Sequence, residues 1–239
     1  MKTVFFVAAA ASAMVGSADA GFLGFAGYVR TVGANKVMDV FAVVSNSSDR
    51  LLNIFNANIS NGGSFIQQAG LSTRGWGRDA ATSSRTNGID SFMTIGADGG
   101  GPYYGVYTAS AASPDGNFTN WGGSGAPNSA TSIPANAGWF LSPPTDPANV
   151  AENMTSGMAG LGATRSDIGS GSGSSFGIWC AHLVFSGSAT SLNWSASATI
   201  KDGVTGASVA GNASGNLLPS PGALALLGVA GVMQRGRRK

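Results

Sequence analysis

The sequence predicts an all-β protein with a single β-sandwich domain of jelly-roll-like type and long Gly/Ser-rich loops. Short apolar segments rich in β-branched residues alternate with clusters of Gly, Asn and Asp, which is typical of many short strands. No βαβ rhythm is present. The chain has 37 glycines and only 10% charged residues, yet 43% of its residues are hydrophobic, which is enough for a packed core.

Three early strands are predicted at residues 22–32, 37–45 and 50–59. Because only four polar residues separate the last two, we expect them to form a hairpin. Weaker strand candidates follow at 64–68, 89–95 and 103–108. A Gly, Ser, Pro and Asn-rich loop is expected at 110–138, and a Gly/Ser-rich loop at 166–175.

The clearest strands come late in the chain. Residues 176–185 are apolar on both faces, which predicts a central strand covered on both sides, with Cys180 and His182 on the same face. Residues 190–200 alternate between apolar and polar, which indicates one buried face and one wet face. Asp202 and Gly203 form a turn toward a further strand at 204–210. The best helix candidate is 147–154, with Asp146 as its N-cap.

Both ends of the chain resemble processing signals. Lys2, an apolar run at 4–15 and the small residues Ala18 and Ala20 match a secretory signal peptide at 1–20, cleaved before Gly21. At the other end an apolar run at 222–233 is short for a transmembrane helix, and a basic cluster follows it. The predicted organisation is a signal peptide at 1–20, a domain at 21–210, a spacer at 211–218 and a hydrophobic tail at 219–239.

The apparent basicity of the chain belongs to its ends. The net charge is +2, but residues 21–221 contain eight basic and ten acidic residues and therefore carry −2. A nucleic-acid partner would need a basic patch on the domain itself, so we predict none. One cysteine excludes an intrachain disulfide.

Candidates for chemistry are few. Cys180 and His182 could be a nucleophile and its base, but their apolar surroundings favour a buried cysteine acting as a small hydrophobe. The acids are scattered, and Asp115 begins a calcium-loop-like stretch that lacks the later acidic ligand of an EF-hand, so a plain turn explains it better. We predict no catalytic residue, no metal site and no cofactor. Trp76, Trp121 and Trp139 lie in Gly-rich stretches and could stack on sugars if exposed, although large aromatics usually fill cores.

The C-terminus resembles the PEP-CTERM sorting signal of bacterial surface proteins. The residues that carry the resemblance are the motif Pro219, Ser220 and Pro221, the apolar opening at Gly222, and the closing basic residues Arg235, Arg237, Arg238 and Lys239. Ser220 stands where the commonest form of the motif has Glu. The middle stretches VFAVVSNSSDRLLNIFNANIS, DSFMTIG and NAGWFLSPP are also similar to poorly characterised proteins of this group.

The resemblance implies export by signal peptidase, temporary retention in the inner membrane by a C-terminal helix, and removal of the tail by an exosortase near Pro219 to Pro221. Such proteins are commonly secreted components of the cell envelope, outer surface or extracellular matrix, often associated with exopolysaccharide. The leading hypothesis is therefore a non-enzymatic surface or matrix protein. The alternatives are a carbohydrate-binding module that uses the tryptophans, and a secreted hydrolase.

Overall fold

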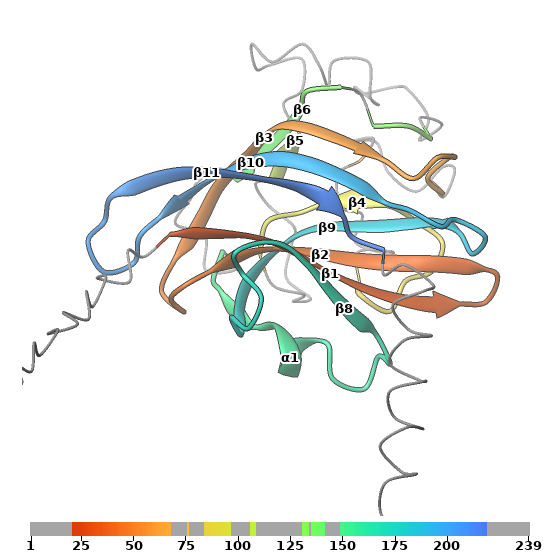
Figure 1. The fold of residues 1–239 in the computed structure, drawn as a ribbon, viewed down its shortest axis with the longest axis horizontal. Helices are drawn as coiled ribbons and strands as arrows, with labels where there is room; N and C mark the ends of the chain where they lie inside the picture. The colour runs from red at the N-terminus through yellow and green to blue at the C-terminus, as the bar shows by residue number, and fades with distance from the viewer. Residues whose placement is uncertain are drawn as a thin grey trace, which may run out of the picture.

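Two antiparallel sheets pack face to face as a β-sandwich in the computed structural model (Figure 1). The structure describes residues 21–67, 76, 84–96, 131–133, 135–141 and 149–218, and the backbone of 106–108. The predicted signal peptide, the tail from Pro219 to Lys239 and Trp121 lie outside these residues. Within them, no helix has the length and apolar character needed to cross a membrane.

The first sheet is built around the long strand β9. Its order is β4 (Phe92–Met93), β9 (Phe176–Ser186), β2 (Asn35–Val44), β1 (Phe22–Val32) and β8 (Thr164–Gly169), and β7 (Glu152–Asn153) also pairs with β9. Residues 177–185 are buried without exception, which confirms the prediction of a central strand covered on both faces.

The second sheet is built around β10 and β3. Its order is β11 (Ser208–Asn216), β10 (Asn193–Lys201), β3 (Arg50–Ser60), β6 (Ala137–Leu141) and β5 (Val106–Thr108). In β10 the apolar residues Trp194, Ala196, Ala198 and Ile200 are buried and the polar residues between them are more exposed, so the predicted alternation is confirmed.

The predicted hairpin between the second and third strands is wrong. β2 lies in the first sheet and β3 in the second, and residues 46–49 form a corner between the sheets. The buried carboxylate of Asp49 holds this corner, because it accepts hydrogen bonds from the backbone N–H groups of Asn46 and Gly203, each at 3.1 Å. β1 pairs with β2 instead.

The predicted spacer at 211–218 is also wrong. Residues 211–216 belong to β11, which pairs with β10 along its whole length, and Leu217 and Leu218 are buried. Small residues allow this close packing: a Cβ atom on Gly211 or Gly215 would lie 2.6 Å from Phe22 or Ile168 of the first sheet. The composition that suggested a flexible linker therefore serves sheet packing.

The predicted helix at 147–154 is wrong as well. The one short helix of the described chain is α1 (Met154–Gly157), and the side chain of Asn153 caps it. Asn149 before it is tied to β3, since its amide exchanges hydrogen bonds of 3.1 and 2.9 Å with the backbone of Leu51. Part of the predicted loop at 166–175 is strand β8.

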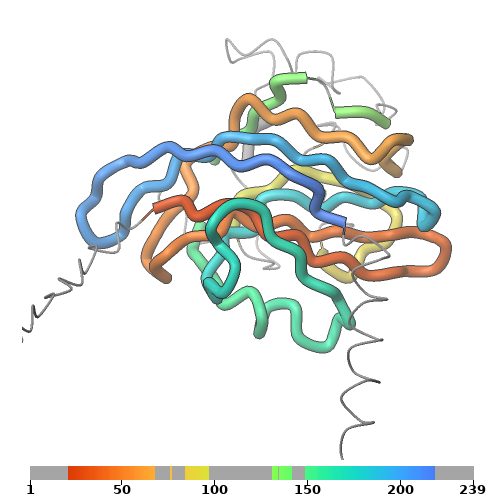
Figure 2. The backbone as a smooth tube through the Cα atoms, in the orientation of Figure 1, coloured from red at the N-terminus to blue at the C-terminus, as the bar shows by residue number. Residues whose placement is uncertain are grey.

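The main core fills the space between the sheets. Trp139 of β6 and Trp194 of β10 meet edge to face with ring centroids 6.3 Å apart. A second, smaller cluster lies on the outer face of the first sheet, where Phe41, Trp179 and Met154 are fully buried. Figure 2 shows the segment 149–163 passing over this outer face.

Candidate functional site

A β-bulge separates Cys180 from His182. The pairing of β2 with β9 shifts by one residue at Val40 and Phe41, opposite Ala181 and Trp179, so Cys180 is the extra residue. The extra residue changes the phase of the strand, and side chains on its two sides no longer alternate regularly. The prediction that Cys180 and His182 share a face is therefore wrong.

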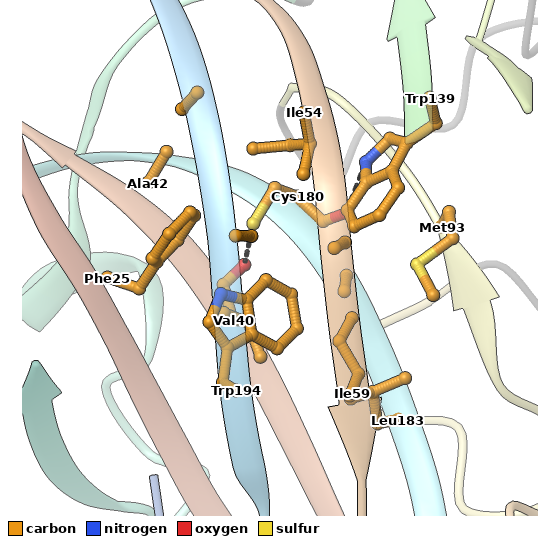
Figure 3. Close-up of a cluster of buried hydrophobic side chains, with 14 of the residues drawn as sticks. Phe25, Val40, Ala42, Ile54, Ile59, Met93, Trp139, Cys180, Leu183 and Trp194 are labelled. Atoms are coloured by element: carbon orange, nitrogen blue, oxygen red, sulfur yellow. Dashed lines mark hydrogen bonds between the residues drawn. The ribbon is translucent and has the colours of Figure 1, made fainter. Parts of the chain in front are cut away.

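Cys180 points into the main core (Figure 3). Its Sγ donates to the Val40 carbonyl at 3.3 Å, and its own carbonyl accepts from Nε1 of Trp139 at 3.0 Å. Burial raises the pKa of the thiol far above its usual value and outweighs a hydrogen bond at the Ala42 backbone, which lowers it. A neutral, enclosed thiol is a poor nucleophile.

His182 lies on the outer face of the first sheet, in a buried cluster of charged groups. Its Nδ1 is 2.7 Å from Oδ1 of Asp39, and Nη1 of Arg30 donates to the other oxygen of Asp39 at 2.5 Å. Asp39 and His182 are fully buried. Burial raises the pKa of Asp39, but the attraction and hydrogen bonds of His182 and then Arg30 outweigh it and hold that pKa below its usual value.

The contacts of His182 give this cluster a structural role. Nε2 lies 3.1 Å from the carbonyl oxygen of Asn87, and the ring stacks on Phe92 with centroids 4.8 Å apart. Both nitrogens thus face oxygen acceptors inside the protein. The cluster ties β1, β2 and β9 to the segment 84–92 that covers them.

Arg85 covers part of the same outer face of the first sheet. Its guanidinium lies 4.6 Å from the ring centre of Trp179, and its Nη1 donates to Oε2 of Glu152 at 2.9 Å. A cation over an aromatic ring and a paired carboxylate both stabilise a buried guanidinium. The outer face of the first sheet is therefore covered by the chain itself.

The tryptophans proposed for sugar stacking are core residues where the structure describes them. Trp76 and Trp139 are each 1% exposed. Trp76 packs edge to face on Phe65, and Trp139 donates its Nε1 to buried backbone carbonyls. Neither ring can stack on a sugar, which corrects that part of the alternative hypothesis.

The outer face of the second sheet is exposed and polar. We call "polar face" the outward side chains of three neighbouring strands, namely Asn58 and Ser60 of β3, Asn193 and Ser195 of β10, and Ser214 and Asn216 of β11. The strand register places them in two rows, Ser60–Asn193–Asn216 and Asn58–Ser195–Ser214. Each row consists of uncharged amides and hydroxyls.

A shallow hollow of about 600 Å³ lies over the polar face, bordered by Ile133 and Ala135. Asn58 is held in place by the backbone N–H of Asn136, which donates to its Oδ1 at 3.2 Å. Oδ1 of Asn216 accepts from the backbone of Leu192 and Leu218 at 2.9 and 3.0 Å, which leaves its amide nitrogen to donate outward. The hollow thus presents oriented hydrogen-bonding groups within a lining that is mostly apolar.

Sequence reasoning missed the polar face. The Ser and Asn alternation in β10 was a usable signal for one strand. Nothing in the sequence showed that β3 and β11 would flank β10 and align their own polar residues with it.

Over the described residues, no group of three or more His, Cys, Asp or Glu side chains could hold a metal ion. The calcium-loop-like stretch at Asp115 lies outside those residues. No protein-family model matches this chain, and no curated protein or solved structure is similar to it.

Proposed function

We propose that this chain is an exported bacterial protein of the cell surface or extracellular matrix, non-enzymatic, with a jelly-roll-like sandwich as its mature domain. The observation that carries the proposal is the position of the sandwich along the sequence. Strand β1 begins at Phe22, two residues after Ala20, and Leu218, the last residue that the structure describes, is buried and directly precedes Pro219. The described fold thus lies between the two processing signals that we infer from the sequence.

In this proposal signal peptidase cleaves after Ala20, and the hydrophobic tail then holds the chain in the inner membrane through a C-terminal helix. An exosortase removes the tail near Pro219, Ser220 and Pro221. The basic residues that close the tail keep its end in the cytoplasm, in agreement with the positive-inside rule. The separation of Cys180 from His182 supports the non-enzymatic part, because it removes the nucleophile and base pair that the sequence offered.

Deleting residues 219–239 in a host that carries an exosortase tests the proposed sorting of the protein. We expect the shortened protein to pass into the medium without a membrane-held precursor, whereas the complete chain passes through one and loses mass at its C-terminus. Changing Arg235, Arg237, Arg238 and Lys239 to Gln tests the basic end separately, and the end of the tail should then no longer be kept in the cytoplasm. An unchanged location and an unchanged processed mass after the deletion would overturn the proposal.

The polar face favours a second candidate function, the binding of a neutral exopolysaccharide. Sugar hydroxyls are matched by amide and hydroxyl groups, and the two rows of the polar face carry no charge that would require an ionic ligand. This candidate replaces the buried Trp76 and Trp139 with side chains that solvent can reach. The ligand would lie across β3, β10 and β11.

Affinity electrophoresis through the producer's own polysaccharide tests this function. Changing Asn193 and Ser195 together to Ala should abolish retardation of the protein, because both side chains line the centre of the hollow. Ser208→Ala, at the far end of β11, is the matched control and should bind like the parent chain. Equal migration of the double variant and the parent would contradict the assignment.

A further inference from the structure

β11 is an edge strand without the usual protection of edges. On one side it pairs with β10 from Ser208 to Asn216, and no other strand of the described chain pairs with its free side. Natural edge strands commonly carry charged residues or proline, which discourage pairing with another chain. The sequence of β11, SVAGNASGN, has neither.

Alternate backbone groups of β11 point away from the protein. The N–H of Leu217 donates to the carbonyl of Leu192 at 2.9 Å, and the N–H of Asp202 donates to the carbonyl of Ala207 at 2.8 Å. In an antiparallel pair the directly bonded positions recur every second residue. The odd-numbered residues of β11 therefore bond to β10, and residues 208, 210, 212, 214 and 216 direct their N–H and C=O groups outward.

The neighbouring edge of the first sheet differs. β8 lies beside β11 on the same side of the sandwich (Figure 1). It carries the ion pair of Arg165 and Asp167 at 2.7 Å, and Arg165 also donates to the carbonyl of Ser174 at 2.9 Å. Charges of this kind protect an edge. β8 is therefore protected by charges that β11, the longer edge strand beside it, does not have.

We propose that β11 pairs antiparallel with β11 of a second copy of this chain, about a two-fold axis at Asn212. In this register residue 212 faces residue 212 of the second copy, 210 faces 214, and 208 faces 216. All five pairs use the outward backbone groups, so about ten backbone hydrogen bonds form at two per bonded pair. An isologous contact of this kind closes as a dimer.

The side chains fit the same register. On the outer face Asn212 meets its own copy, Ala210 meets Ser214, and Ser208 meets Asn216, so amides and hydroxyls lie opposite one another without like charges. On the inner face Gly211 lies opposite Ala213 and Val209 lies opposite Gly215, so each pair contains a glycine and leaves room for close approach. The pairing extends the second sheet, and the polar face with it, across two copies.

Backbone bonds exposed at an edge replace bonds to water, and association costs translational freedom. We therefore expect a weak, concentration-dependent dimer rather than a permanent one. Analytical ultracentrifugation of the full chain, from low micromolar to near millimolar concentration, measures it. Association through any other segment is common to all variants of β11 and does not distinguish them.

Two double variants test the register. Ala210→Lys with Ser214→Lys places like charges opposite each other at two positions and should weaken the dimer at least about tenfold. Ala210→Lys with Ser214→Asp places opposite charges at the same positions and should restore association to the parent level or above. Loss and rescue together support the pairing. A parent chain that stays monomeric throughout, or two double variants that associate equally, would overturn it.

Asn212→Pro tests the backbone directly and does not depend on the double variants. The N–H of Asn212 points outward and is not used in the fold, and proline is tolerated at such edge positions. This variant should keep the circular dichroism spectrum of the parent and lose the dimer, whereas Asn212→Ala, which keeps the N–H, should remain dimeric. Association of Asn212→Pro that is as strong as that of Asn212→Ala refutes the proposal.

Discussion

Replacing Asp39 with Asn should remove the buried carboxylate that holds Arg30 and His182 on the outer face of the first sheet. The side chain keeps its size, so no cavity forms. Asn has one oxygen acceptor, and its NH₂ group must then face either Arg30 or His182, both of which present donors at 2.5 and 2.7 Å. At least one of these two buried partners then loses its acceptor.

Breaking a buried ion pair by removing one partner costs about 3–5 kcal/mol. That is a large share of the roughly 5–15 kcal/mol by which domains are stable. Urea unfolding at pH 7, followed by the fluorescence of the buried tryptophans, measures the loss. Asp167→Asn is the matched control: the same change in a pair whose side chains are about one-fifth exposed should cost at most about 1 kcal/mol. If Asp39→Asn cost no more than the control, the reasoning about the cluster would be refuted.

Asp39→Asn should also change how the stability of the protein depends on pH in the acid range. The folded pKa of Asp39 lies below its usual value, so its contribution to stability is present above the unfolded pKa of about 3.9 and is lost as the pH falls through the lower folded pKa. Between about pH 5 and pH 2 the stability of the parent should therefore fall more steeply than that of Asp39→Asn. Parallel curves would show that the carboxylate is not held in its charged form by the fold.

Three further predictions concern other parts of the fold. The thiol of Cys180 should react with a disulfide reagent at least about a hundredfold more slowly in the native protein than in urea, since it is buried and its pKa is raised; equal rates would contradict the burial. Gly24→Ala should lower the free energy of unfolding, measured in urea, by about 1–3 kcal/mol. The backbone of Gly24 has φ +133°, and a Cβ there would lie 2.1 Å from the carbonyl oxygen of Ile168. Gly33→Ala, at a turn with open space, is the control and should lose less stability. Asp49→Ala should cost about 2–4 kcal/mol in the same assay, because two backbone N–H groups at the corner lose their acceptor, and a loss below 0.5 kcal/mol would be too small for that role.

The strands that sequence predicts best are those whose pattern is set by burial alone. β9 is apolar on both faces because both faces are covered, and β10 alternates because one face is wet. These properties are local, and the sequence expresses them residue by residue. The weak candidates near 64–68 and 89–95 shrink to an isolated bridge at Phe65 and the two-residue β4.

The incorrect predictions have a common physical cause: the strands that pair with each other are far apart in the sequence. A four-residue link serves a hairpin or a corner between sheets equally well, and the buried Asp49 decides for the corner. The bulge at Cys180 depends on the register between β2 and β9, strands about 140 positions apart in the sequence. β11 resembles a linker in composition, and only its neighbours β10, Phe22 and Ile168 show that small residues are needed there.

The same contrast between local and non-local features applies to the candidate site. Burial of Trp76 and Trp139 agrees with the general behaviour of large aromatics, which the sequence analysis weighed against sugar stacking. The polar face requires three strands in one register, so no single segment predicts it. The buried cluster of Arg30, Asp39 and His182 likewise joins residues of three strands.

The central positions of β9 and β10 have a consequence for the order of assembly if the chain is exported as we propose. Val40 pairs with Ala181 and Asn53 pairs with Thr199, so each sheet joins an early strand to one near the end of the domain. Contacts of such high sequence separation form slowly, because the loop between them must close first. A chain that crosses a membrane from its N-terminus therefore cannot complete either sheet until residues 176–216 have emerged. If the tail holds the chain at the membrane as we propose, this delay gives the last strands time to dock before release.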